Sequence, residues 1–170
     1  PHHSKLVNSI REALFRCGIK DGMTLSFHHH FRSGDKIVNM VMDEIHSMGI
    51  RDITICSSSL GTAHDPIIPY IEDGTITMIY SSGVRGNIGR AIHIDIAFIG
   101  APTSDECGNL RAIGGKSDCG VLSYAYADAQ YADKVVAITD TMVPFPNIPA
   151  SISMVNVDYV CRVDSIGAPE

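Results

Sequence analysis

Short apolar runs rich in β-branched residues alternate along this chain with segments of helical periodicity. The runs that read as strands are residues 23–27, 52–56, 75–80, 92–99, 134–139 and 159–163. The segments that read as helices are residues 4–15, 36–48, 64–73 and 121–132. Parallel strands need long crossovers, which are usually helical. The alternation therefore predicts an α/β fold, a mostly parallel sheet covered on both faces by helices, in a single domain over residues 1–170.

Composition places the chain among ordinary globular proteins. Hydrophobic residues make up 45% of its 170 residues and charged residues 19%. The net charge is −6 and no basic run is present, which argues against nucleic acid as a partner. No apolar stretch is long enough to cross a bilayer, and no signal peptide opens the sequence. We expect a cytoplasmic protein that is not bound to membranes.

Five cysteines are spread along the chain without a CxxC pair. The odd number and wide spacing predict neither a disulfide framework nor a zinc site. Cys56 and Cys161 fall in strand-like runs and are expected to be small core residues. A reducing compartment agrees with this pattern.

Three consecutive histidines, His28, His29 and His30, follow the predicted strand 23–27. Core packing does not explain them, because successive strand residues point to opposite faces. Open α/β sheets bind their ligands where strands end. Three adjacent residues form a poor metal site, since their side chains diverge. We therefore favour rings that donate hydrogen bonds to a ligand, one or two pointing inward while the remainder packs or meets solvent.

Three further polar loops follow predicted strands, at residues 57–59, 82–87 and 105–109. Glycines in such loops let the backbone approach a ligand, and backbone N–H groups hold phosphate or an oxyanion. Arg85 adds a fixed positive charge for a carboxylate or phosphate. With the three histidines, the predicted substrate-binding residues in and beside these loops are Ser26, Ser58, Gly83, Arg85, Gly86, Asn87, Asp105, Gly108 and Asn109.

Two of these loops have a structural interpretation as well. The serine run could supply a nucleophile, but no Gly-x-Ser-x-Gly elbow is present, and capping of the following helix is favoured. Asp105 and Glu106 could act as acid and base. The favoured alternative is a turn in which Asp105 binds the backbone, Gly108 and Asn109 adopt left-handed angles, and the backbone touches the ligand.

The remaining ionisable candidates are few. Among the five glutamates, Glu12, Glu44 and Glu72 fall on predicted helix surfaces and Glu170 is terminal. A carboxylate nucleophile is therefore either Glu106 or absent from this chain. Three other histidines receive ordinary roles, at a helix start (His64), in a strand (His93) and on a solvated helix face (His46).

One junction does not fit a parallel sheet. The strand-like region before Arg90 meets the next one at Ala91 with almost no connection between them. Parallel neighbours need about a dozen residues of crossover. The junction predicts either a hairpin or a segment missing between residues 90 and 91.

At the polar loops the sequence resembles the alpha subunit of citrate lyase, a citrate CoA-transferase. The triple-histidine strand is the most specific part of the resemblance, whereas the Asp-x-x-Gly-Asn loop is shared by CoA-transferases more widely. The likeness covers nearly the whole chain and is carried by residues 22–32, 82–86, 94–102, 105–109, 131–136 and 146–152.

This resemblance implies a CoA-transferase-type domain that exchanges acetate for citrate on a thioester, giving citryl-thioester and acetate. The thiol belongs to a CoA-like prosthetic group on an acyl carrier (gamma) subunit, so this chain holds no cofactor of its own. The implied partners are the beta and gamma subunits, citrate, acetate and acetyl-CoA, in an oligomeric assembly. The attacking glutamate comes from a second half, and this chain matches the first. The resemblance therefore places no catalytic residue in this chain, and the poor geometry of adjacent histidines leaves no metal site expected.

The resemblance also implies a further loop before the strand at residues 92–99, containing glycine and arginine, which is missing here. That loop is a candidate citrate-binding element, so we expect this chain alone to be inactive. Three alternatives stay open: a CoA-transferase for another small acid, a ligand-sensing module of the same fold, and a half that only docks partner subunits.

Overall fold

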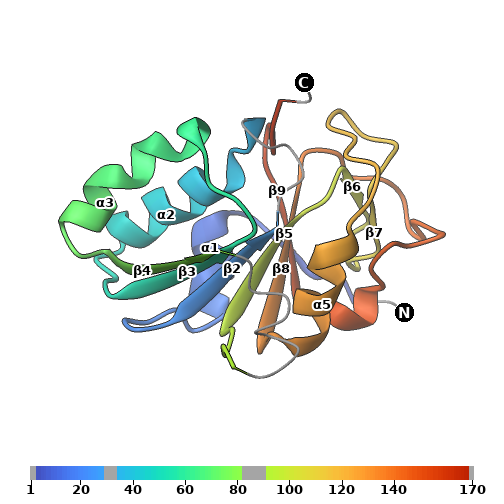
Figure 1. Cartoon of the computed structure of the whole chain (residues 1–170). Coiled ribbons are helices and arrows are strands. Elements are labelled where there is room, and N and C mark those ends of the chain that lie inside the picture. Colours follow the sequence, from blue (N-terminus) through green and yellow to red (C-terminus); the bar gives the residue numbers. More distant parts are fainter. Residues whose placement is uncertain (1–2, 29–33, 82–90, 169–170) are drawn as a thin grey trace.

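A seven-stranded parallel sheet forms the centre of the protein (Figure 1). The computed structural model describes residues 3–28, 34–81 and 91–168. The strand order is β1-β9-β8-β5-β2-β3-β4, and every neighbouring pair is parallel. This confirms the predicted α/β fold. The strands are β1 (Leu6–Val7), β2 (Thr24–His28), β3 (Ile53–Ser57), β4 (Ile76–Ser81), β5 (Ile96–Gly100), β8 (Lys134–Thr139) and β9 (Tyr159–Arg162).

The two faces of the sheet carry different cores. Helices α1 (Ile10–Arg16) and α2 (Ile37–Ser47) cover a face of large residues, on which Phe27 and Phe98 stack with ring centroids 5.3 Å apart. Helix α5 (Ser123–Tyr131) covers the other face, where alanines predominate. Figure 1 shows these helices on opposite sides of the sheet. Strand residues alternate between faces, so Ser26 and His28 of β2 lie toward α5.

The first predicted helix is wrong over its first half. Leu6 and Val7 form β1, which pairs with Val160 and Cys161 of β9. The helix begins only at Ile10, where the Ser9 side chain accepts a hydrogen bond from the Glu12 N–H. A parallel edge pairing satisfies the backbone of residues 6–7, and apolar periodicity cannot distinguish it from a helix turn.

The predicted helix at residues 36–48 is confirmed as α2, and Asp35 lies just before its N-terminus. The Asp35 carboxylate accepts hydrogen bonds from the Ile37 and Val38 N–H groups at 3.3 Å each. The predicted helix at residues 64–73 is instead a 3-10 helix, η2 (Thr62–Ile67), followed by α3 (Ile68–Glu72). Pro66 and Pro69 lack the N–H that a continuous helix would need.

Short elements account for the other differences. Strand β5 starts at Ile96 rather than residue 92, because the Asp95 side chain accepts a hydrogen bond from the Thr24 N–H. A two-stranded antiparallel sheet, β6 (Thr103–Ser104) and β7 (Leu110–Arg111), and a 3-10 helix, η3 (Met154–Asn156), are not predicted from the sequence. In the described ranges no helix has the length and apolar character required to cross a membrane.

All five cysteines are free thiols, as the sequence predicts. Cys56 and Cys161 are buried in the core. Burial raises the pKa of each of these two thiols to about 11 and that of Cys17 to about 12. At neutral pH these groups stay protonated, so they pack as small apolar residues and are poor nucleophiles.

Candidate functional site

The carboxyl edge of the sheet holds the polar residues that follow β2 and β3. These strands are neighbours, and Phe27 of β2 pairs with Ser57 of β3. Beside them lies a cavity of about 370 Å³, lined by residues 57–59, Leu60, Ile79 and Tyr80. Ligands of open α/β sheets bind at this edge. The cavity is therefore the candidate site within the described residues.

The serine run lines this cavity and caps no helix. The Ser57 hydroxyl donates to the Ser59 carbonyl at 3.1 Å. The next helix, η2, begins after Gly61, whose N–H donates to His64 Nδ1 at 3.0 Å. The favoured prediction of a serine cap is therefore wrong, because the helix starts further along the chain. The run leaves Ser58, half-buried, at the cavity wall.

At the end of β2, His28 forms a buried pair with Asp128 of α5. Its Nε2 lies 2.6 Å from the Asp128 carboxylate, and the two side chains are 4% and 1% exposed. The sequence analysis predicts that one or two of the three histidine rings meet a ligand while the remainder packs or meets solvent; the His28 ring packs against Asp128. Asp128 is missed by the sequence analysis, although it is the one charged residue in the alanine-rich stretch 125–129.

Ser26 lies in the middle of β2 and is buried, rather than at the carboxyl end of the strand. It is 1% exposed, and its hydroxyl has no hydrogen-bond partner among the described residues. Its neighbour on β3 is Cys56. Burial raises the pKa of the Cys56 thiol to about 11, and the negative charge of Asp128 adds to that rise. Cys56 is therefore excluded as a thiolate nucleophile.

A second buried pair, His64 and Asp35, holds the loops after β2 and β3 together. His64 Nδ1 accepts from the Gly61 N–H, so Nε2 carries the proton and donates to the Asp35 carboxylate at 3.0 Å. Asp35 also forms a backbone bridge with Gly167. His64 lies in the first turn of η2, close to the helix start predicted for it, and its ring has a structural partner.

The Asp105–Asn109 turn lies beside β1 and β9, far along the strand order from the cavity. Its Glu106 carbonyl accepts a hydrogen bond from the Lys5 N–H, just before β1, and Gly108 packs on Val157, just before β9. Strands β1 and β9 are at the opposite end of the strand order from β3 and β4. The structure therefore does not bring Asp105, Gly108 and Asn109 together with the cavity.

Asp105 is saturated by hydrogen bonds from its own turn and from Asn147. Its two carboxylate oxygens accept the N–H groups of residues 107, 109 and 147 and the side-chain amide of Asn109, at 2.7–3.0 Å. Burial by itself would raise the pKa of Asp105. These hydrogen bonds outweigh burial and lower that pKa below its usual value. The carboxylate is therefore a structural anion.

The turn prediction is confirmed in part. Asp105 binds the backbone as expected, and Gly108 has a φ of +95°. Asn109 does not adopt left-handed angles. Within the described ranges, the one non-glycine residue with a positive φ is Asp52. The Asn109 carbonyl and side chain bind Asn147 and the Met154 N–H instead.

Several predicted site residues lie outside the described residues. These are His29, His30, Gly83, Arg85, Gly86 and Asn87. Of the six that are described, His28 and Ser58 come to the carboxyl edge between β2 and β4, Ser26 lies beneath it, and the three residues of the Asp105 turn lie elsewhere.

Comparison with known proteins identifies the family. The family model for the citrate lyase alpha subunit matches residues 3–93 and 89–170. The chain belongs to the citrate lyase alpha subunit family. A relative, the citrate lyase alpha chain of Haemophilus influenzae, is 44% identical over 192 residues, which cover 98% of this chain and 38% of that protein.

Solved structures agree with this membership of the citrate lyase alpha subunit family. The alpha subunit of citrate lyase from Streptococcus mutans, solved in complex with citrate, has a TM-score of 0.93 and 46% identity. The match covers 99% of this chain and 38% of that one, so the present chain spans well under half the length of such relatives. An acyl-CoA transferase from Escherichia coli O157:H7 shares the fold, with a TM-score of 0.73 and 17% identity over 94% of this chain and 50% of that one.

The described glutamates of this citrate lyase alpha family member lie away from the cavity. Glu12 and Glu44 are on helix surfaces, where they pair with Arg16 and Arg11. Glu72 is exposed at the end of α3, and Glu106 belongs to the turn at the opposite edge. Within the described ranges, no glutamate lines the cavity. The geometry therefore offers no carboxylate nucleophile beside Ser58.

Proposed function

We propose that this chain is the first part of a citrate CoA-transferase, the alpha component of a citrate lyase, and that it provides the surface on which citrate binds. The observation that carries the proposal is the close match to the Streptococcus mutans alpha subunit, which was solved with citrate. The polar cavity at the carboxyl edge of β3 and β4 supplies a place for such a ligand.

The reaction would proceed through a carboxylate nucleophile contributed from beyond this chain. A glutamate attacks the acetyl thioester, its carboxylate oxygen bonds to the acetyl carbon, and the thiolate leaves. The thiolate then attacks the glutamyl carbonyl of the mixed anhydride and displaces acetate, giving a glutamyl thioester. Citrate repeats both steps in reverse order and leaves as citryl-thioester. This is covalent catalysis by a carboxylate, and each addition develops an oxyanion.

This chain's contribution is binding. Citrate carries three carboxylates, which bind best to charge-assisted hydrogen-bond donors. In this proposal, Arg85, His29 and His30 hold these carboxylates, and backbone N–H groups of the neighbouring loops meet the oxyanions. His28 acts as a positioning residue, since its ring already contacts Asp128. Ser58 contributes a hydroxyl from the cavity wall.

We propose that the relatives contain a segment before β5 that this chain lacks. The alignment with the Haemophilus influenzae relative spans 192 residues, more than the 170 residues of this chain. The family model matches in two segments that meet at residues 89–93. Both observations support a missing segment at the junction of Arg90 and Ala91. We therefore expect the chain alone to be inactive.

The proposed substrates and partners follow from the same function. A CoA-like group on an acyl carrier subunit would present the thioester, with acetyl-CoA as its simpler substitute. A beta subunit would cleave the citryl product, and the assembly would be a cytoplasmic oligomer. No residue of this chain is proposed to hold the CoA-like group permanently.

The decisive assay measures acetate release from acetyl-CoA and citrate by this chain and by its full-length parent side by side. Release by the parent alone is expected. In the parent, His29→Ala and Arg85→Ala should raise the KM for citrate, whereas His46→Ala, on the half-exposed face of α2, should leave it unchanged. Unchanged KM in both site variants would overturn the assignment of the citrate-binding residues.

The same assay separates other functions of this fold. Release driven by another small acid in preference to citrate would replace the proposed substrate. Release by neither protein, with any acid, would favour a sensing or docking role. Release by the short chain would place the nucleophile within it and make Glu106 the first residue to substitute.

A further inference from the structure

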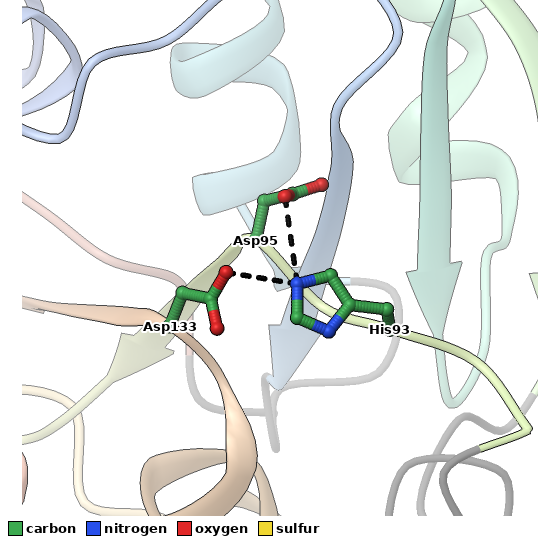
Figure 2. Close-up of side chains that lie close together, drawn as sticks. All are labelled: His93, Asp95 and Asp133. Atoms are coloured by element: carbon green, nitrogen blue, oxygen red, sulfur yellow. Dashed lines mark hydrogen bonds and ion pairs between the residues drawn. The ribbon is translucent and has the colours of Figure 1, made fainter.

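At the amino edge of the sheet, three side chains with metal-binding atoms converge. His93 lies between Asp95 and Asp133, with its Nε2 2.8 Å from the Asp133 carboxylate and 3.7 Å from the Asp95 carboxylate (Figure 2). The three potential ligand atoms all lie within 4.8 Å of one another. Residues 93 and 95 precede β5, and residue 133 precedes β8. The cluster therefore lies at the amino ends of the strands, whereas the cavity lies at their carboxyl ends.

Backbone hydrogen bonds hold the three residues in place. The Asp133 N–H donates to the Ile94 carbonyl at 3.1 Å, and the Lys134 N–H donates to the Asp95 carbonyl at 3.0 Å. One oxygen of Asp95 accepts the Thr24 N–H at 2.7 Å, and its other oxygen is the one nearest His93. Metal-binding carboxylates are commonly oriented in this way by a hydrogen bond on the second oxygen.

The charge at the cluster favours a cation. Two carboxylates face one imidazole, and no lysine or arginine of the described residues forms an ion pair with them. Lys134, next in the chain, contacts Asp158 instead at 3.5 Å. In the tautomer that suits the 2.8 Å contact with the Asp133 carboxylate, His93 Nε2 carries the proton and donates it. A divalent cation can take that proton's place, with the proton moving to Nδ1.

We propose that His93, Asp95 and Asp133 bind a divalent cation of the zinc class. One imidazole nitrogen and two carboxylate oxygens suit zinc and its neighbours, whereas magnesium and calcium prefer oxygen alone. His93 and Asp133 are 65% and 60% exposed, so an ion reaches them from solvent and keeps water in its remaining coordination position. The sequence predicts no such site, because residues 95 and 133 are brought together only by the pairing of β5 with β8.

Another exposed histidine–aspartate pair provides a matched control. His46 Nδ1 lies 3.3 Å from the Asp73 carboxylate, and its ring stacks on Tyr70. The same Nδ1 lies 3.1 Å from the Thr75 hydroxyl, and no second carboxylate of the described residues joins the pair. His46 therefore resembles His93 in its exposure and its partner and lacks the third ligand.

The test is a competition titration of the 170-residue chain with Zn²⁺ against a chelating dye, repeated with His93→Ala, Asp133→Asn and His46→Ala. The tightest equivalent of Zn²⁺ should weaken at least about tenfold in the first two variants and stay unchanged in the third. The consecutive histidines elsewhere in the chain supply background binding that is common to all four proteins. Equal binding by the wild type and Asp133→Asn would overturn the proposal.

A second readout locates the ion without relying on affinity. Zinc anomalous scattering from a crystal grown with Zn²⁺ should place a peak beside His93 Nε2 in the wild type and none there in His93→Ala. The melting temperature of the wild type should rise with added Zn²⁺, because the ion binds the folded chain, and that rise should shrink in Asp133→Asn. An anomalous peak at other histidines alone would refute the site.

Discussion

Two polar loops of this protein, both predicted from the sequence to meet a ligand, lie in different structural surroundings. The serine run at residues 57–59 ends β3 and lines a cavity of about 370 Å³. The Asp105–Asn109 turn joins β6 to β7 and is packed against the start of β1 and β9. The first faces open space at the carboxyl edge, whereas the second is a buried structural element.

The difference lies in where the hydrogen bonds go. Both carboxylate oxygens of Asp105 accept hydrogen bonds, from four donors within the fold. In the serine run, the Ser57 hydroxyl donates to the Ser59 carbonyl, and half-buried Ser58 stands at the cavity wall. A saturated polar group has nothing left for a ligand, while one at a cavity wall does. Polar composition alone therefore cannot distinguish a binding loop from a scaffold.

The largest expected effect comes from the buried pair beneath the carboxyl edge. Asp128→Ala leaves His28 without its partner at 4% exposure, and the free energy of unfolding should fall by about 3–5 kcal/mol. Urea unfolding measures this loss. Asp133→Ala, whose partner His93 is exposed, should cost less than about 1 kcal/mol. Equal losses in the two variants would show that burial of the pair does not matter.

The next effect tests the scaffold role of the turn. Asp105→Asn replaces one accepting oxygen with an amide that faces backbone donors, so the free energy of unfolding should fall by about 2–3 kcal/mol. Asp21, which accepts a single hydrogen bond from the exposed Arg51 N–H, is the matched control. Asp21→Asn should cost less than about 1 kcal/mol. A stable Asp105→Asn protein with weakened citrate binding would reverse the comparison.

The same carboxylate predicts a pH dependence. The folded-state pKa of Asp105 is lowered, so its contribution to stability is complete above the ordinary value of 3.8 and is lost as the pH falls through the folded-state pKa. The stability difference between the wild type and Asp105→Asn should therefore shrink on acidification in this range. A difference that grows toward low pH would contradict the assigned shift.

A smaller effect is expected at Gly108, which has a φ of +95°. A Cβ added there would lie 2.9 Å from the Val157 side chain. Gly108→Ala should therefore cost about 2 kcal/mol in unfolding free energy, from strain and crowding together. A Val157→Ala background removes the Cγ1 contact and keeps the Cβ contact, so part of the crowding is relieved and the same substitution should cost somewhat less there. Strict additivity of the two substitutions would leave crowding without a role.

The smallest effect on stability is expected at the cavity. Ser58 is half-buried at its wall, and Ser58→Ala should change the unfolding free energy by less than about 0.5 kcal/mol. In the full-length parent the same substitution should raise the KM for citrate. Ser153→Ala, at an exposed position before η3, should alter neither quantity. A stability loss without a change in KM would make Ser58 a scaffold residue.

Periodicity predicts most of the sheet because a parallel strand buried on both faces needs a continuous apolar run. Strands β2, β3, β4 and β8 lie within a residue or two of their predicted bounds. Periodicity does not predict the strand at Leu6–Val7, because two residues are too few for a pattern and the partner strand is more than 150 residues away. The two-residue strands β6 and β7 are missed for the same reason.

The candidate site is predicted less completely than the fold. His28 ends β2 and Ser58 directly follows β3, so the predicted strands place both residues. Asp128 cannot be found this way, because its partner lies 100 positions earlier in the chain and only the packing of α5 on β2 joins them. The Asp105 turn is misplaced because a short β6 strand carries the chain away from the carboxyl edge.

The most direct test is hydrogen–deuterium exchange of the full-length parent with and without citrate. The account predicts protection by citrate in peptides that cover residues 26–30, 57–60 and 79–87, and no change in the peptide that covers residues 105–109. Protection of residues 105–109, with none at residues 57–60, would contradict the assignment of the carboxyl edge as the binding surface.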